Sequence, residues 1–282
     1  MYTRFFGLTE SPFALTPDPR YLYLSHRHQE ALAHLRYGIT QGGGFVQLTG
    51  EVGTGKTLMI RTLLEQLPAP VDVALILYPF LSVREFVAAI CHDLGIERPA
   101  DDSLKSLIDA LNAYLLDRHA RGRRTVLVID EAQNLSHEVL EQVRLLTNLE
   151  THREKLLQIL LIGQPELNQL LAQPDLRQLA QRITARYRLT PLSRRETGEY
   201  VHHRCQVAGA RTALFSPAAL RAVHRFSGGI PRLINVVCDR ALLGTYAVGQ
   251  SQVSGAIVRR AAAEIGSGAR AARPRRRQLA AA

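Results

Sequence analysis

The segment FVQLTGEVGTGKT, residues 45–57, carries the most informative pattern in this chain. Its first residues are mainly apolar and predict a short buried strand that ends at Gly50. Residues 50–57, GEVGTGKT, match the phosphate-loop pattern, GxxxxGK followed by Ser or Thr, at every fixed position. A helical run follows over Leu58–Leu67. A glycine-rich turn that binds nothing is the alternative, but the position of the motif between a strand and a helix favours phosphate binding.

The residue types in this loop suit a nucleotide polyphosphate. Glycines let the backbone turn so that successive N–H groups point inward at an anion, and the following helix adds its positive N-terminal end. Lys56 is expected to bring a full charge to the β- and γ-phosphates, and the Thr57 hydroxyl to ligate Mg²⁺. The residues expected to contact the nucleotide are Gly50, Glu51, Val52, Gly53, Thr54, Gly55, Lys56, Thr57 and Leu58.

A second motif supplies paired acids. Residues 126–129, VLVI, are all apolar, as in a parallel strand that is covered on both faces, and Asp130 and Glu131 follow directly. Ligands of open α/β sheets bind at this end of the strands. We expect Asp130 to hold Mg²⁺, directly or through water, and Glu131 to polarise the attacking water. Gln164 directly follows the fourth predicted strand and is placed to help position that water. A polar strand end that merely begins a loop is the alternative to the acid pair, and the preceding phosphate loop argues against it.

Several arginines are candidates for contacts with the phosphates. Residues 229–232, GIPR, open a predicted helix, and Arg232 would reach back to the nucleotide as a permanently charged donor. Arg182 and Arg186 lie just before and at the fifth predicted strand. An arginine there would project into a neighbouring subunit's nucleotide and stabilise charge in the transition state. Arg182 is favoured over Arg186, with Arg177 a weaker third. Each of these arginines would otherwise be a solvated surface side chain.

The order of predicted elements divides the chain. Strands alternate with helices over residues 41–191, which predicts a parallel α/β nucleotide-binding domain, and helices alone follow over residues 192–265. Residues 1–40 are expected to form an arm and a helix packed on the core, with prolines excluding a helix before Pro19. Residues 266–282 form a basic tail, expected to be disordered or juxtamembrane. The predicted strands lie near residues 45–48, 71–78, 125–129, 156–162 and 187–189.

Composition limits the class of protein. The 282 residues are 46% hydrophobic and 21% charged, as in soluble globular proteins. The balance of 35 Lys and Arg against 25 Asp and Glu favours anionic partners such as nucleotides, nucleic acids or acidic membranes. The 3 cysteines are scattered and lack CxxC spacing, which indicates a reducing compartment and no disulfide framework or metal site. No signal peptide or membrane-spanning run is evident, so a cytoplasmic location is expected.

The final residues, ARPRRRQLAAA, combine a basic cluster with an apolar end. Arginines at 270, 273 and 275–277 followed by apolar residues are typical of a cytoplasmic flank that enters a membrane helix. This pattern predicts contact between the tail and anionic lipids. A disordered basic tail is the alternative interpretation.

Together these motifs resemble those of AAA+ ATPases. More specifically, FFGLTESPFALTPDPRYLYLS, GEVGTGKT, IDEAQNLS, RLLTNLET, LIGQPEL, LAQRITARYRLTPLS and FSGGIPRLIN resemble the ExeA-type general secretion pathway protein A family over about residues 1–265. The resemblance implies a five-stranded parallel sheet with flanking helices, followed by a helical lid domain. It identifies Lys56 and Thr57 with Walker A, Asp130 and Glu131 with Walker B, Gln164 with sensor 1, Arg182 with the arginine finger and Arg232 with sensor 2.

The same resemblance implies an activity and a location. Family members bind ATP with Mg²⁺, hydrolyse it to ADP and phosphate, and assemble as homo-oligomers, either rings or dimers. They couple hydrolysis to the assembly of the type II secretin at the cytoplasmic face of the bacterial inner membrane, with an inner-membrane partner protein. Full-length relatives continue into a transmembrane helix and a periplasmic peptidoglycan-binding region, which this sequence does not include. The resemblance thus predicts that the natural gene continues beyond Ala282.

Two other functions stay open at this point. DNA-linked transposition ATPases of the TniB and TnsC type share the core, together with segments like GQPEL and GxPR, but the opening FFGLTESPFALTPDPRYLYLS favours the secretion type. A catalytically idle nucleotide switch is the third hypothesis. Tyr78 supports it, because family members often have a small polar residue there that tethers the catalytic glutamate. The intact Lys56, Glu131 and Arg232 argue against it.

Overall fold

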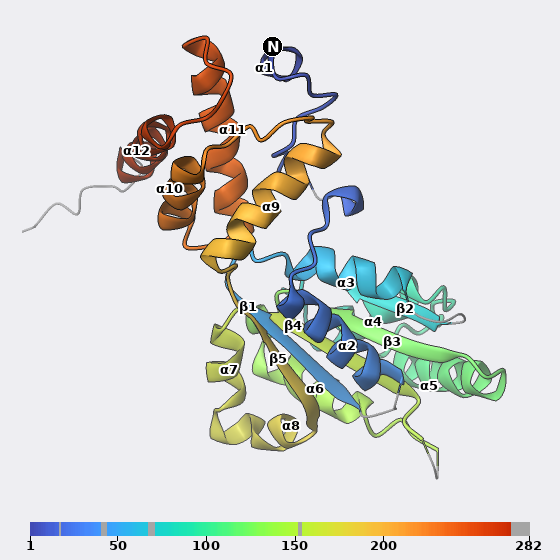
Figure 1. The fold of residues 1–282 in the computed structure, drawn as a ribbon. Coiled ribbons are helices and arrows are strands. Elements are labelled where there is room, and N and C mark those ends of the chain that lie inside the picture. Colours follow the sequence, from blue (N-terminus) through green and yellow to red (C-terminus); the bar gives the residue numbers. More distant parts are fainter. Residues whose placement is uncertain (17, 41–43, 67–70, 152–153, 272–282) are drawn as a thin grey trace, which may run out of the picture. The chain divides into compact units, whose positions relative to one another are not determined.

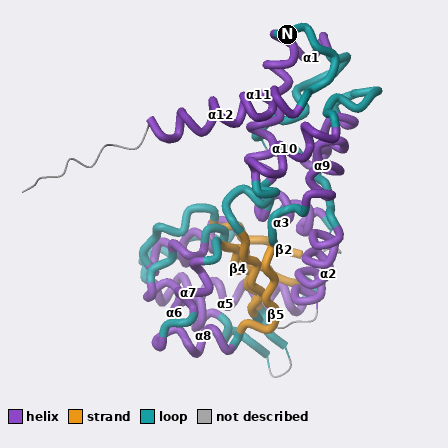
Figure 2. Tube along the Cα trace, turned by 60° about the vertical axis from the view of Figure 1, so that its left-hand side comes forward, coloured by secondary structure: helices purple, strands orange, loops and turns teal. Residues whose placement is uncertain are grey.

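The chain forms two compact units in its computed structural model (Figure 1). The structure describes residues 1–271 apart from 17, 41–43, 67–70 and 152–153. One unit comprises His26–Thr190 and contains all the strands, and the other joins Met1–Ser25 to the chain from Pro191 onward and is helical (Figure 2). The segment expected as one N-terminal arm and helix, residues 1–40, is thereby divided between the two units.

The α/β unit is built on a five-stranded parallel sheet in the order β2-β3-β4-β1-β5. Strands β1, β3 and β4 are buried along almost their whole length, as expected of parallel strands covered on both faces. The predicted sheet is therefore confirmed. The strands are β1 (Phe45–Gly50), β2 (Val71–Ile76), β3 (Arg124–Ile129), β4 (Leu157–Gly163) and β5 (Ile183–Leu189).

Strand β5 is longer than the sequence pattern predicted. The prediction covered residues 187–189, whereas the strand begins at Ile183. It is an edge strand, and its side chains alternate between half-buried and exposed positions until Leu189. The outward positions are polar, at Thr184, Arg186 and Arg188, so the strand lacks the continuous apolar run that identified the inner strands.

Helices cover both faces of this sheet (Figure 1). On one face, α4, α5 and α6 share a continuous core with Phe45 and Leu127. On the other, α2 packs on β1 and β5, and Gly38 lies so close to Val46 that a β-carbon at residue 38 would meet its Cγ2 at 2.4 Å. Serines at 82, 103 and 136 cap α4, α5 and α6 with side-chain hydrogen bonds. The helices are α2 (His26–Thr40), α3 (Lys56–Glu65), α4 (Val83–Asp93), α5 (Leu104–Ala120), α6 (His137–Leu146), α7 (Glu166–Leu171) and α8 (Arg177–Gln181), with 3₁₀ turns η2 (Ala132–Asn134) and η3 (Pro174–Leu176).

The helical unit has a core of its own, in which residues from α9, α10, α11 and α12 pack with the N-terminal segment. Gly229 precedes α11 with a positive φ of 82°, and a β-carbon there would meet the Leu192 carbonyl oxygen at 1.9 Å, so only glycine fits. None of the helices within the described residues has both the length and the apolar character needed to cross a bilayer. The helices are α1 (Tyr2–Phe5), α9 (Arg194–Val207), α10 (Pro217–Ser227), α11 (Pro231–Ala247) and α12 (Gly255–Ala271), with the 3₁₀ turn η1 (Pro19–Tyr21).

The prediction of a wholly extended N-terminal arm is wrong at its start, where Tyr2–Phe5 forms a short helix. The prolines begin only at residue 12, so they do not constrain the backbone before it. Arg204 of α9 fixes the arm farther along: its side chain is buried and donates hydrogen bonds to the carbonyl oxygens of Pro12 and Ala14. Its guanidinium also lies 4.6 Å from the centre of the Tyr21 ring.

The predicted basic tail lies largely outside the described residues. Helix α12 extends to Ala271, and the arginines at 273 and 275–277 follow it. Tail contact with anionic lipids therefore stays a prediction.

We expect Arg204→Met to loosen the N-terminal arm. The substitution keeps an apolar stem but leaves the Pro12 and Ala14 carbonyls without their buried donor, which should cost about 1.5–3 kcal/mol. The melting temperature should fall, and a protease should cleave the arm at a lower concentration. Arg195→Met is the matched control, because this exposed arginine on the same helix forms a surface ion pair with Glu199. Equal effects of the two substitutions would contradict the anchoring role.

Candidate active site

The phosphate loop begins where β1 ends and leads directly into α3. Gly53 and Gly55 have φ values of 82° and 97°, in the left-handed region that favours glycine. Gly50 has no room for a side chain, because a β-carbon would lie 2.8 Å from the Leu189 carbonyl oxygen of neighbouring β5. The two fixed glycines of the motif, Gly50 and Gly55, and the additional Gly53 are thus each required by backbone geometry.

Lys56 begins α3, and its side chain is buried at the loop. Its Nζ donates to the carbonyl oxygens of Gly50, at 2.8 Å, and Glu51, at 3.2 Å. Burial lowers the pKa of Lys56, while the carboxylates of Glu131 and Asp130 oppose that effect. The ammonium is therefore held against the loop by neutral acceptors that a phosphate oxygen would replace.

The Asp130 carboxylate joins the two motifs. Its Oδ2 accepts from the Thr57 hydroxyl at 2.8 Å, and its Oδ1 accepts from the backbone N–H of Glu131 at 2.9 Å. The described residues hold no group of three or more His, Cys, Asp or Glu side chains that would bind a metal by themselves. Mg²⁺ in nucleotide sites typically takes only one or two protein ligands and completes its shell with phosphates and water. The Thr57–Asp130 pair fits this pattern.

Glu131 is held by two glutamines. It has a positive φ of 52°, and its Oε2 accepts from Gln164 Nε2 at 3.0 Å and from Gln133 Nε2 at 2.6 Å. Partial burial acts to raise the pKa of Glu131, but these hydrogen bonds and the charge of Lys56 outweigh it, so the pKa is lowered. The carboxylate is ionised and available to accept a proton.

Gln133 is a site residue that the sequence analysis missed. Besides donating to Glu131, it accepts from the Gln164 backbone N–H at 3.0 Å, and Gly163 leaves the space that it occupies. Tyr78, at the position expected to tether the glutamate, is instead 82% exposed. The only sequence signal for Gln133 was its place two residues after Glu131, on the turn η2.

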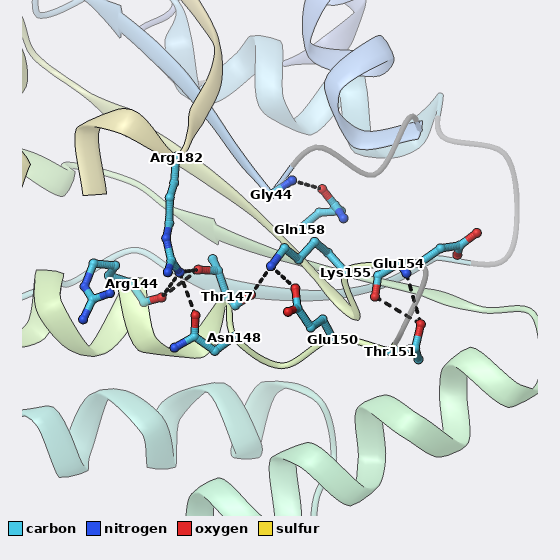
Figure 3. Close-up of polar contacts among 10 residues, drawn as sticks. All are labelled: Gly44, Arg144, Thr147, Asn148, Glu150, Thr151, Glu154, Lys155, Gln158 and Arg182. Carbon is cyan, nitrogen blue, oxygen red and sulfur yellow. Dashed lines mark hydrogen bonds and ion pairs between the residues drawn. The ribbon is translucent and has the colours of Figure 1, made fainter. Parts of the chain in front are cut away.

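Arg182 lies at the opposite end of β5 from the phosphate loop. Phe45 pairs with Ile183 at the start of β5, whereas Gly50 pairs with Leu189 at its end. Figure 3 shows the Arg182 side chain directed at Arg144, Thr147 and Asn148, at the C-terminal end of α6. Arg186 and Arg177 are exposed. The choice of a trans-acting arginine among these three stays a prediction.

Arg232 is at the second position of α11 in the helical unit, with Pro231 in the first turn as expected. Its side chain is exposed. Its predicted contact with the phosphates involves the other unit and stays a prediction.

Known proteins resemble this chain in sequence and in fold. A family model described as an AAA domain matches residues 39–171. General secretion pathway protein A of Aeromonas hydrophila is 56% identical over 265 residues, which are 94% of this chain and 48% of that protein. The chain thus spans about half the length of this relative.

Solved structures share the fold at low sequence identity. Cdc6p from Pyrobaculum aerophilum has a TM-score of 0.69 and 20% identity, covering 90% of this chain and 70% of that one. The Aeropyrum pernix ORC2 protein, in its ADPNP–ADP complexes, has a TM-score of 0.66 and 18% identity, covering 90% of this chain and 71% of that one. Sequence identity, matched domain and fold agree: the chain contains an AAA domain and is similar to general secretion pathway protein A over 94% of its length.

Proposed function

We propose that this chain binds ATP with Mg²⁺ at the phosphate loop and hydrolyses it to ADP and phosphate within a homo-oligomer. The observation that carries this proposal is the Glu131 carboxylate, which two glutamines hold in its ionised form beside Lys56 and the Thr57–Asp130 pair. A site that only bound nucleotide would not need a half-buried, oriented base of this kind.

Each residue then has a defined part in the reaction. The loop N–H groups and the Lys56 ammonium bind the β- and γ-phosphate oxygens. Thr57 and Asp130 hold Mg²⁺, which neutralises charge on those oxygens when bound. Glu131 accepts a proton from the attacking water. Gln164 donates to Glu131 through its amide nitrogen, and its amide oxygen orients that water.

Contacts from outside the α/β unit complete the proposed site. Arg232 would donate to the phosphates from the helical unit, and an arginine near the start of β5 would reach the nucleotide of the adjacent subunit. An arginine supplied across an interface stabilises charge that develops in the transition state, which makes turnover depend on assembly.

In the cell, we propose that hydrolysis serves the type II secretion pathway. The relative that is 56% identical to this chain is a general secretion pathway protein, which supports this role over a DNA-linked one. The proposed place is the cytoplasmic face of the bacterial inner membrane, with an inner-membrane partner and with the basic tail on anionic lipids. Stimulation of turnover by duplex DNA, lost at high salt, would instead support the transposition-type alternative.

Glu131→Gln should bind ATP with near-native affinity and hydrolyse it on the order of a hundredfold more slowly, because the amide cannot accept the proton. Calorimetry and phosphate release measure the two effects. The substituted side chain retains its length and leaves the Thr57–Asp130 pair in place. Turnover at the native rate would remove Glu131 from the mechanism.

Lys56→Ala should lose ATP binding itself, because it removes the one full positive charge that the loop directs at the phosphates. Arg61→Ala, on the exposed side of the same helix, is the control and should bind normally. If calorimetry finds unchanged affinity in Lys56→Ala, the loop holds phosphate through its backbone alone.

Gln133→Ala should shift the acid limb of the pH–rate profile to higher pH. The Gln133 hydrogen bond helps to keep the pKa of Glu131 low, so removing it raises that pKa and the base becomes protonated, hence inactive, at a higher pH. The pH dependence of kcat measures the shift. Asn134→Ala, an exposed neighbour, should leave the profile unchanged. An unmoved acid limb in Gln133→Ala would contradict the holding role.

A further inference from the structure

Two cations converge on the C-terminal end of α6: Arg182, which directly precedes β5, and Lys155, which lies shortly before β4 (Figure 3). Arg182 donates through Nη1 to the Arg144 carbonyl oxygen at 3.1 Å, to Thr147 Oγ1 at 2.6 Å and to Asn148 Oδ1 at 2.8 Å. Lys155 donates to the Thr147 carbonyl oxygen at 3.0 Å. The last carbonyls of a helix lack partners within the helix and carry partial negative charge, so cations there stabilise it. Arg182 is thus part of the C-terminal cap of its own subunit's α6.

The cap lies at the C-terminal end of α6, and the N-terminal end of the same helix follows the catalytic site. Ser136 caps the start of α6, and the turn η2 before it carries Gln133, the donor to Glu131. Glu131 itself adopts the left-handed backbone from which that turn begins. The position of α6 along the sheet therefore helps to fix where the Gln133 amide meets the carboxylate.

The environment of Arg186 differs from that of Arg182. Arg186 lies within β5, on the outward face of the strand. It is exposed, and its Nη2 donates to one backbone oxygen, that of Ala180, at 2.7 Å. The strand is at the edge of the sheet, so another chain can approach this side. If Arg186 turned toward a neighbouring subunit, the Ala180 carbonyl could bond to water instead. If Arg182 did so, three acceptors would lose their donor, and one of them is on the buried Thr147.

We propose that Arg182 is a positioning residue that holds α6 in its own subunit, and that Arg186 is the guanidinium that β5 presents to a neighbouring subunit's nucleotide. The second part rests on the proposed ATPase function in an oligomer. The first part concerns one subunit and holds whether or not ATP is hydrolysed.

Mixing experiments separate the two arginines. Arg186→Ala alone should lose turnover on the order of a thousandfold. In an equimolar mixture with Glu131→Gln, about a quarter of the interfaces pair an intact Glu131 with an intact Arg186, so turnover should reappear after subunit exchange. Arg182→Ala mixed with Glu131→Gln should show no gain over Arg182→Ala alone, because its defect lies in the subunit that carries the intact Glu131. The opposite pattern, recovery with Arg182→Ala and none with Arg186→Ala, would overturn the proposal and make Arg182 the trans-acting residue.

Hydrogen exchange tests the positioning role without ATP. Arg182→Ala should speed amide exchange over residues 144–149, whereas Arg186→Ala, the matched control, should not. Arg182→Lys should restore part of the protection and part of the turnover, since a lysine still places a cation at the helix end. Arg186→Lys should remain inactive, because a point charge does not replace a planar guanidinium. Unchanged exchange in Arg182→Ala would overturn the first part of the proposal.

A failure of the proposed function has a different signature. Wild-type protein that shows no turnover at any concentration would refute the ATPase assignment and, with it, the role of Arg186. The exchange result would still decide whether Arg182 holds α6.

Discussion

The carboxylate of Asp130 is the point at which the two halves of the nucleotide site meet. It accepts hydrogen bonds from the Thr57 hydroxyl and from the backbone N–H of Glu131, and the first of these joins residues 73 positions apart in the chain. The bond is possible because β1 and β3 are parallel with only β4 between them, so their C-terminal ends reach the same edge of the sheet. A carboxylate this deeply buried requires such partners. Sheet topology thus brings Thr57 and Asp130 together.

The environment of Glu131 solves a chemical problem. A base must be ionised, yet a salt bridge to an adjacent cation would occupy the oxygen that has to accept the proton. Here two neutral donors, the amides of Gln133 and Gln164, bond to the carboxylate and lower its pKa together with the charge of Lys56. Directing the Glu131 side chain at these two amides requires a left-handed backbone, which is an unfavourable conformation for a residue other than glycine.

Patterns local in sequence were predicted well, and those that depend on tertiary contact were not. The phosphate loop and the apolar strand before Asp130 are each determined within a few residues, so sequence alone located them. Gln133 was not predicted, because its role depends on a tertiary contact between η2 and the end of β4. The extent of β5 was missed because an edge strand buries one side and shows no continuous apolar run. Which acceptors surround Arg182 depends on how α6 ends, which no spacing in the sequence reveals.

The outward row of side chains on β5 also bears on how separate copies of the chain meet in solution. Thr184, Arg186 and Arg188 give this edge of the sheet a positive, well-hydrated border. Two such borders repel each other, so newly made chains are discouraged from joining strand to strand in the manner that leads to fibrils. Polyanions reverse that repulsion. The charges of Arg186 and Arg188, which keep single chains apart, would therefore attract a neighbouring chain that has phosphate bound. Solubility and the proposed assembly would then depend on the same electrostatic feature.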